Sequence, residues 1–285
     1  MATDIVSVIV VTCNSLPSLD GCLAGLLRAV AAIDHELLVV DNNSTEDPSP
    51  LVRSHFPDAR VQVLKKNVGF ATACNRGARA AKGMFLLFLN PDVVLDSGAV
   101  SSLLAALKSY HKPGAVAGRM RYPDGGFQPT CRRLPTIGNI VFSRGSVLSR
   151  LFGRNTLYTL PDYEETTPVP AVAATVMLIR RSLFMLMKGF DQRFLMYMED
   201  TDLCKRLSTL GYVNLFVPTA GAVHDWGRGS DAGRTRRSWL HHNSMWKYFL
   251  KHLPNGFSLL VLPLILTVNF LFTLVIGTLQ RSGRK

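Results

Sequence analysis

Several short signatures of common protein classes are missing from this sequence of 285 residues. No two of its five cysteines have the spacing of a metal-binding knuckle or of a dithiol redox site. It has neither a G-x-G-x-x-G nor a Walker motif, which counts against hydride-transfer Rossmann enzymes and P-loop enzymes. No basic segment precedes the first apolar run, so no secretory signal peptide is visible. The cysteine spacing and the lack of a visible signal peptide fit a cytosolic protein whose cysteines are reduced and buried.

Acidic residues are scarce in the second part of the chain. The sequence has 32 basic and 20 acidic residues, for a net charge of +12. Residues 1–118 hold 10 basic and 10 acidic residues, whereas residues 119–285 hold 22 basic and 10 acidic ones. A basic half of this kind is typical of a protein that meets a polyanion, an anionic membrane surface or phosphorylated substrates.

Apolar runs alternate with helical patterns between residues 5 and 95. The runs are rich in Val, Ile or Leu, as is usual for strands that are buried on both faces. Four strands are expected: at residues 5–11, 36–40 and 61–64, and a fourth that begins at Leu86 and ends in Asn90-Pro91-Asp92, with helices between them at 19–30, 47–56 and 70–81. The alternation predicts an α/β fold with a doubly wound, mostly parallel sheet.

Two of the expected strands lead into acidic turns, at Asp41 and at Asn90-Pro91-Asp92. Ligands of open α/β sheets bind at the carboxyl ends of the strands. Asp41 is therefore a candidate to accept hydrogen bonds from a ribose or a base, and Asp92 to hold a divalent cation that carries a diphosphate. Helix capping by Asp41 and turn formation by Asp92 are the structural alternatives. The helix after Gly69 can aim backbone N–H groups at a phosphate.

Four blocks in this order resemble the family 2 glycosyltransferases of the GT-A fold, and within them the bacterial rhamnosyltransferase-like branch. The blocks are Val8-Ile9-Val10-Val11-Thr12-Cys13-Asn14, Val39-Val40-Asp41-Asn42-Asn43-Ser44, Asn67-Val68-Gly69-Phe70-Ala71 with Asn75-Arg76-Gly77, and Leu89-Asn90-Pro91-Asp92. The resemblance implies that Asp92 is the second acid of the Asp-x-Asp metal motif, with Asn90 in place of the first. It places nucleotide-sugar binding at Thr12, Asn14, Asp41, Asn43, Asn67, Gly69, Asn75, Asn90 and Arg228. Cys13 departs from the tyrosine of many members.

Three acids lie within four residues at Glu199-Asp200-Thr201-Asp202, at the start of an expected helix. The helix dipole accounts for one acid there but less well for three. Carboxylates this close raise one another's pKa, which suits a general base. The block resembles the Glu-Asp-x-Asp-Leu signature of the family, which implies that Asp200 is the catalytic base and that Glu199 supports it. Ala174-Thr175 stands where relatives usually have Gly-Ala, and the larger residue is expected to narrow the acceptor side of the site.

His224 follows an expected strand at residues 213–217 and precedes Gly227-Arg228-Gly229-Ser230. A single histidine at such a place is more often a hydrogen-bonded structural residue than a ligand. The family has a histidine followed by Gly-x-Ser here, however. The resemblance therefore implies that His224 completes a metal site with Asp92 and the diphosphate oxygens, for Mg²⁺ or Mn²⁺.

Two segments point to a membrane. Residues 143–155 place four apolar residues on one helical stripe and three arginines off it, as in a basic amphipathic helix at a membrane interface or in an ordinary surface helix. Phe257–Leu279 has 23 residues without a charge. As a helix this stretch would be roughly 34 Å long, which exceeds the thickness of about 30 Å of the hydrocarbon core of a bilayer. A span, a re-entrant hairpin and a soluble segment at a dimer interface are all compatible with it, and Pro263 and Asn269 favour a kink.

These observations predict three segments: a nucleotide-sugar-binding half at 1–118, an acceptor and catalytic half at 119–252, and a membrane-associating segment at 253–285.

The expected activity is inverting transfer of a sugar, with dTDP-rhamnose as the donor implied by the resemblance alone. The expected acceptor is a polyprenyl-linked or polysaccharide acceptor, at the cytoplasmic face of a bacterial plasma membrane. A membrane-tethered sugar-nucleotide sensor without catalysis is the alternative. A nucleic-acid-binding protein is disfavoured, because no aromatic platform lies among the arginines. The sequence leaves the oligomeric state open.

Overall fold

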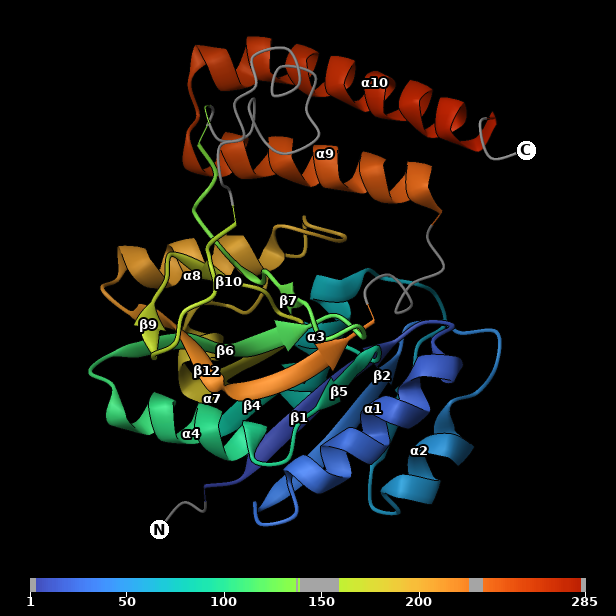
Figure 1. Ribbon diagram of the computed structural model, residues 1–285, viewed down its shortest axis with the longest axis vertical. Coiled ribbons are helices and arrows are strands. Elements are labelled where there is room, and N and C mark those ends of the chain that lie inside the picture. The colour runs from blue at the N-terminus through green and yellow to red at the C-terminus, as the bar shows by residue number, and fades with distance from the viewer. Residues whose placement is uncertain (1–3, 137, 139–158, 226–232, 283–285) are drawn as a thin grey trace. The chain divides into compact units, whose positions relative to one another are not determined.

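The computed structural model describes residues 4–136, 138, 159–225 and 233–282 (Figure 1). Contacts between residues divide the chain into two compact units. Unit 1 comprises Met1–Arg133, Thr159–Gln192 and Glu199–Asp231, and unit 2 comprises Leu134–Tyr158, Arg193–Met198 and Ala232–Lys285. The predicted three-segment division, with boundaries after residues 118 and 252, stays a prediction.

Unit 1 is built from strands and helices that alternate along the chain. Its strands are β1 (Val6–Thr12), β2 (His35–Asp41), β3 (Arg60–Val63), β4 (Phe85–Leu89), β5 (Val93–Leu95), β6 (Pro113–Arg121), β7 (Phe127–Gln128), β8 (Cys131–Arg132), β9 (Thr167–Pro168), β10 (Ala171–Val172), β11 (Val176–Arg180) and β12 (Val213–His224). Its helices are α1 (Leu16–Ala29), α2 (Ser49–His55), α3 (Phe70–Ala80), α4 (Ala99–Ser109), α7 (Arg181–Leu186) and α8 (Glu199–Thr209).

The central sheet has the order β3-β2-β1-β4-β11-β6-β12-β5, with β7 beside β6 and β9 beside β12. The pairs β2–β3, β1–β2, β1–β4 and β6–β12 are parallel, whereas β11 and β5 run against their neighbours. The predicted, mostly parallel α/β sheet is therefore confirmed, with antiparallel insertions. The strand that begins near Leu86 ends before Asn90-Pro91-Asp92, as predicted, and is β4; a short strand that was not expected, β5, follows this turn.

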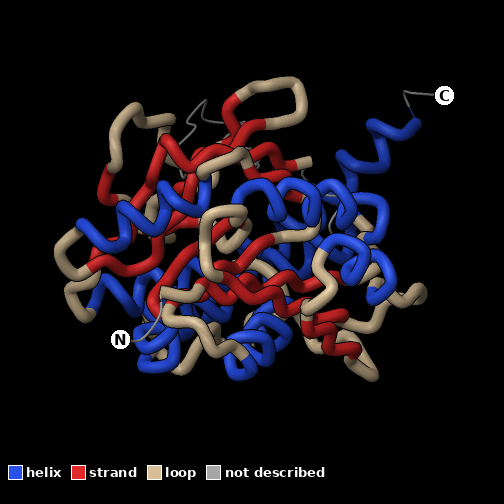
Figure 2. Tube along the Cα trace, turned by 90° about the horizontal axis from the view of Figure 1, so that it is seen from below, coloured by secondary structure: helices blue, strands red, loops and turns tan. Residues whose placement is uncertain are grey.

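Helices cover both faces of the sheet, and the alternation along the strands decides which side chains meet which helix. Val8 and Val10 of β1 belong to the core cluster that includes α1 and α4. Ile9 points to the other face, where a Cβ on Gly77 of α3 would lie 2.6 Å from its Cγ2. In the same way Phe88 of β4 packs against Phe184, with ring centroids 5.0 Å apart. Figure 2 shows the strands as a central layer with helices on either side.

Unit 2 contains two long helices, α9 (Arg234–His252) and α10 (Leu262–Ser282), joined through a π-helical turn, η1 (Phe257–Val261). They run antiparallel in Figure 1. Tyr248 and Phe249 of α9 share a buried cluster with Leu262 and Leu266 of α10. None of the helices in the described part of the chain is long and apolar enough to cross a membrane. The predicted amphipathic helix at residues 143–155 lies outside the described residues.

Candidate active site

The carboxyl ends of β1 and β2 meet at one point, because Thr12 and Asp41 are partners in the parallel register. Asp41 is almost fully buried, and its carboxylate accepts hydrogen bonds from the backbone N–H and the hydroxyl of Ser44. That hydroxyl also accepts a hydrogen bond from the backbone N–H of Asn14, at 2.8 Å. Asn14 and Asn43 have positive φ angles of 52° and 70°, so both turns need residues that tolerate the left-handed region. The Asp41 carboxylate therefore closes the turn after β2 rather than capping a helix, since α2 begins at Ser49 and has no side-chain cap.

A third loop joins this corner through Asn42, which the sequence did not single out. Its side-chain amide donates to Asn67 Oδ1 at 3.1 Å, and its oxygen accepts from the backbone N–H of Val68 at 2.8 Å. Asn67 Oδ1 also accepts from the backbone N–H of Gly69, whose φ of 82° favours glycine. The predicted donor-binding residues Thr12, Asn14, Asp41, Asn43, Asn67 and Gly69 thus lie together on three interlocked loops. The repeated asparagines after β2 were the signal for Asn42.

Asp92 and His224 come together, as predicted, from segments far apart in the sequence. Strands β12 and β5 lie side by side (Figure 1). His224 is the last residue of β12 and pairs with Val93, the first residue of β5, so it stands beside Asp92. Its Nε2 lies 3.3 Å from Asp92 Oδ1, and both side chains are buried. On the other side of the ring, Nδ1 lies 2.6 Å from the Oε1 of Gln128. Because an amide oxygen only accepts, Nδ1 carries the proton.

This corner fits a divalent cation. Because Nδ1 is hydrogen-bonded to Gln128, the Nε2 of His224 is directed at a carboxylate oxygen of Asp92, and a nitrogen and an oxygen placed in this way can both bind a cation. Neighbouring ligands of an octahedral ion with bonds of about 2.1 Å are roughly 3 Å apart, close to the separation seen. Among the described residues, no group of three or more His, Cys, Asp or Glu side chains could hold a metal ion. An ion here would therefore complete its coordination with water and substrate oxygens.

Asn90 stands at the end of β4, between this corner and the next. Its backbone N–H donates to Thr175 O at 2.9 Å, and its carbonyl accepts from the Sγ of Cys22 at 3.4 Å. The side-chain Oδ1 is buried and has no hydrogen-bond partner among the described residues. Burial, with the charge of Asp92 second, raises the pKa of Cys22 to about 12, so this thiol is neutral and inert.

Asp200 lies at the start of α8 and is held by four donors. Its Oδ2 accepts from Arg132 Nη2 at 2.8 Å and from the backbone N–H of Ala174 at 3.2 Å. Its Oδ1 accepts from the backbone N–H and the hydroxyl of Thr201. Asn90 and Asp200 are therefore anchored to two consecutive residues, Thr175 and Ala174. Arg132 of β8 was not foreseen, because nothing in the sequence relates residue 132 to residue 200.

Glu199 differs from its neighbour. Its carboxyl group is buried, and its Oε2 has no hydrogen-bond partner among the described residues. Burial, with the charge of Asp200 as the second cause, raises the pKa of Glu199 to about 8. At neutral pH Glu199 is therefore mostly protonated, and a guanidinium group faces the Asp200 carboxylate. The environments of the two acids are thus sharply different, as in acid–base pairs with divided roles.

Two residues near the site have structural partners. Asp202 pairs with Arg206 one turn along α8 at 2.8 Å, which accounts for the third acid of the cluster. Asn75 was predicted to bind the donor, but its amide donates to Phe190 O and accepts from Phe190 N, at 2.7 and 2.9 Å. A Cβ on Gly189 would lie 2.4 Å from the Asn75 oxygen, which shows how closely this contact is packed. Asn75 therefore does not join the three donor loops through its side chain. Arg228 lies outside the described residues.

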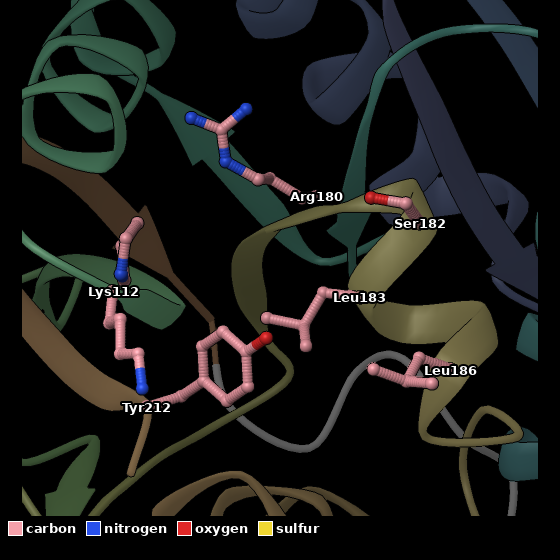
Figure 3. Close-up of a pocket in the computed structure, with 7 residues that line it drawn as sticks. Lys112, Arg180, Ser182, Leu183, Leu186 and Tyr212 are labelled. Carbon is pink, nitrogen blue, oxygen red and sulfur yellow. The ribbon is translucent and has the colours of Figure 1, made fainter. Parts of the chain in front are cut away.

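A cavity of about 410 Å³ lies at the opposite end of the strands. It is lined by Lys112, Pro113, Arg180, Ser182, Leu183, Leu186 and Tyr212 (Figure 3). Lys112 and Tyr212 immediately precede β6 and β12, and Arg180 is the last residue of β11, which runs against them. The cavity is thus remote from Asp41, Asp92 and His224, which stand at the carboxyl ends of the parallel strands.

Comparison with known proteins identifies the family to which this chain belongs. The profile of glycosyl transferase family 2 matches residues 7–186. The chain therefore belongs to family 2 of the glycosyltransferases and is a glycosyltransferase.

Sequence relatives place the chain in the rhamnosyltransferase-like branch. It is 32% identical over 259 residues to the N-acetylglucosaminyl-diphospho-decaprenol L-rhamnosyltransferase of Mycobacterium tuberculosis, and the match covers 85% of this chain and 83% of the relative. Rhamnosyltransferase WbbL of Escherichia coli is 29% identical over 148 residues, 51% of this chain and 54% of the relative.

Solved structures support the GT-A fold. A mannosyltransferase from Pyrobaculum calidifontis, in complex with GDP-Man and Mn²⁺, superposes with a TM-score of 0.60 at 17% identity, over 100% of this chain and 80% of that one. GalNAc-T7 with UDP, GalNAc and Mn²⁺ gives a TM-score of 0.57 at 14% identity, over 86% of this chain and 47% of that one. Both structures hold a divalent metal.

Proposed function

We propose that this glycosyltransferase moves rhamnose from dTDP-rhamnose to a polyprenyl-diphosphate-linked saccharide, with inversion at the anomeric carbon, in the synthesis of a cell-envelope glycan. The observation that carries the proposal is the match to the mycobacterial rhamnosyltransferase, which extends over 85% of the chain. The name of that enzyme specifies both a rhamnosyl group and a decaprenyl-diphosphate-linked acceptor. The geometry of unit 1 fits each part of such a reaction.

The donor nucleotide would lie on the three loops at the ends of β1 and β2. Asp41 and Asn43 present oxygen and amide groups for the ribose and base, and the buried Asn90 Oδ1 is an acceptor that a donor sugar or phosphate-bound water can satisfy. The N-terminus of α3, after Gly69, points backbone N–H groups at the same edge of the sheet. Arg228 is proposed as a further donor ligand.

Asp92 and His224 would hold Mg²⁺ or Mn²⁺ beside the diphosphate. When bound, the ion neutralises the charge that develops on the leaving nucleoside diphosphate. Gln128 keeps the imidazole in the tautomer whose Nε2 faces Asp92, and burial of all three side chains prevents them from turning to solvent. The imidazole ligand favours Mn²⁺ over Mg²⁺ at this site.

Asp200 would take the proton from the acceptor hydroxyl. Arg132 holds one carboxylate oxygen of Asp200 in place. The other oxygen accepts from the Thr201 hydroxyl, which can rotate away so that this oxygen is free to take the proton of the acceptor. Glu199, protonated at neutral pH, avoids a second negative charge in the same buried space. This division assigns the proton acceptor to the ionised acid and leaves a supporting role to the neutral one.

An acceptor on a polyprenyl chain is confined to a bilayer, so the enzyme would work at a membrane surface. We place it at the cytoplasmic face of the plasma membrane, where nucleotide sugars are made. Residues 253–285 would contribute to membrane association, as expected from their lack of charge between positions 253 and 280.

The proposal is tested by mixing the purified full-length chain with a panel of nucleotide sugars and a short-chain polyprenyl-diphosphate N-acetylglucosamine, and following the acceptor mass. We expect an increase by one deoxyhexose with dTDP-rhamnose and much slower reaction with other donors. The Asp92→Asn variant is the matched control, because it keeps the side-chain volume but removes the charge. A faster reaction with a different donor would overturn the assignment of rhamnose while leaving the enzyme class intact.

A further inference from the structure

Helix α10 has apolar residues on two opposite faces, and among the residues that the structure describes only one of these faces is buried. Leu262 and Leu266 are buried in the cluster shared with α9. On the opposite face, Leu260 of the η1 turn and Leu264, Val268 and Leu271 of α10 are 73, 67, 60 and 54% exposed. Spacings of four, four and three residues place these four on one stripe. They form the outer stripe of α10. A helix that is apolar on both faces is expected to have both covered.

The inner face of α10 is fastened to α9 by polar and aromatic contacts. Asn269 Nδ2 lies 3.0 Å from His242 Nε2, and Phe270 packs edge-on against Trp239 with ring centroids 5.6 Å apart. These contacts continue the buried cluster along the antiparallel pair. Helix α9 packs along α10 through this length. If α10 entered a bilayer lengthwise, Arg236, Lys247 and Lys251 of α9 would therefore enter it too. Charged residues are strongly disfavoured in the hydrocarbon core.

The charges of this segment fit an anionic surface. Residues 232–285 contain no Asp or Glu, and their basic residues are Arg234, Arg236, Arg237, Lys247, Lys251, Arg281, Arg284 and Lys285. Between Leu253 and Gln280 there is no charged residue at all. Trp239 is 55% exposed at the side of α9 that meets α10, and tryptophan is a residue that prefers the interface between lipid and water.

We propose that the α9–α10 hairpin lies flat in the interface of an anionic bilayer, with the outer stripe of α10 at the level of the upper acyl chains and the cations of α9 among the phosphates. The hairpin does not cross the membrane. The inference rests on the proposed function in one respect only, namely that the enzyme works at a membrane. It adds the segment that binds, its orientation and the headgroup charge that it selects.

A second copy of the chain is the competing occupant for the outer stripe. Two hairpins that met through it would bring two clusters of basic residues together without an acidic residue from the same segments to compensate them. Aliphatic side chains flanked by cations are instead the pattern of helices that bind lipid surfaces. Charge complementarity therefore selects the membrane.

The first test is binding of the purified full-length chain to sealed vesicles of phosphatidylcholine, alone or mixed with phosphatidylglycerol. We expect binding to the mixed vesicles that weakens with added salt. The double variant Leu264→Gln with Val268→Gln should lower the partition coefficient by about tenfold or more, because two aliphatic side chains leave the acyl region. Leu186→Gln is the matched control, since Leu186 is 63% exposed but lies on α7 of unit 1. It should bind as the unaltered chain does.

The second test separates a flat hairpin from a span. In a Ser282→Cys variant bound to sealed vesicles, an impermeant maleimide added outside should label the new cysteine, with the unaltered chain as the blank. Protection of Cys at this position would mean that α10 crosses the bilayer and would overturn the proposal. Unchanged vesicle binding by the double variant would also overturn it, as would conversion of a dimer to a monomer in light scattering without loss of vesicle binding. Neither test uses a nucleotide sugar or an acceptor, so failure here is distinct from failure of the transferase assay.

Discussion

Two acidic corners of the same sheet edge differ in what faces the carboxylate. At the first corner Asp92 lies against His224, a side chain that can be neutral or charged and that can bind a metal. At the second corner Asp200 lies against Arg132, a permanent cation. The first corner can therefore gain positive charge by binding a metal. The charge of the second corner is fixed by the arginine. A further negative charge beside it is unfavourable, and the pKa of Glu199 is accordingly raised to about 8.

The difference assigns separate tasks to the corners. A site that must accept a diphosphate and its metal needs a charge that adapts, whereas a base that must be ionised in every turnover needs a constant partner. The first corner should therefore respond to metal removal and the second to pH.

The largest effect is expected at the first corner. Asp92→Ala should abolish turnover, and so should removal of divalent ions with excess EDTA, because the charge on the leaving diphosphate is then stabilised poorly. Activity after EDTA treatment should return on addition of Mn²⁺ or Mg²⁺. Turnover is followed by release of the nucleoside diphosphate. Full activity in excess EDTA would show that the first corner is not a metal site.

At the second corner, Asp200→Asn should lower single-turnover transfer by ~10²–10⁴-fold, which is the usual contribution of a positioned base. Donor affinity should change little, since the three donor loops are untouched. Glu199→Gln copies the protonated form and should cost far less at neutral pH. Measurement of donor affinity beside single-turnover transfer for both variants decides the matter. Near-normal transfer by Asp200→Asn with a collapse in Glu199→Gln would move the base to Glu199.

The pH dependence of transfer provides an independent test of the same assignment. Above pH 8 Glu199 loses its proton beside the Asp200 carboxylate, and two buried negative charges then repel each other. We expect the turnover of the unaltered enzyme to fall above pH 8. The turnover of the Glu199→Gln variant should not fall in this range. If Glu199 were the base, turnover would rise as the pH passes 8. The two profiles have opposite signs.

A smaller effect is expected from the residue that orients His224. Gln128→Leu removes the acceptor for Nδ1–H while keeping a side chain of similar size, so the imidazole loses its fixed tautomer. The concentration of Mn²⁺ that gives half-maximal activity should rise by about 10–100-fold, whereas turnover at saturating metal should recover. Asn214→Leu is not a suitable control, because Asn214 bonds several backbone groups. Asn43→Ala, on a donor loop away from the metal, should leave the metal requirement unchanged.

How far the sequence predicts this site depends on the range of the interaction. Apolar runs and acidic turns are local, so they located Asp41 and Asp92 at strand ends and predicted most strands within a few residues. The partnership of Asp92 with His224 required the family resemblance, since 132 positions separate them. Gln128 and Arg132 lie in short strands without a local signature, and only tertiary pairing brings them to His224 and Asp200. The same holds for the extension of β12 to His224, which pairing with β5 stabilises.

The smallest predicted effect is on stability and follows from the buried Glu199. Its pKa is about 8 in the folded chain against an ordinary value of 4.5, so between these values the folded state binds more protons than the unfolded state. The free energy of unfolding must then decrease as the pH rises through this window, and the stabilisation present below pH 4.5 is lost above pH 8.

The Glu199→Gln variant has no proton to lose at this position, so its free energy of unfolding should depend less on pH. Urea unfolding of both proteins at several pH values measures the two slopes. At pH 8 and above the variant should be the more stable of the two. Parallel slopes would mean that Glu199 is ionised in the folded protein at neutral pH, and the two corners would then no longer differ in the way their charges are compensated.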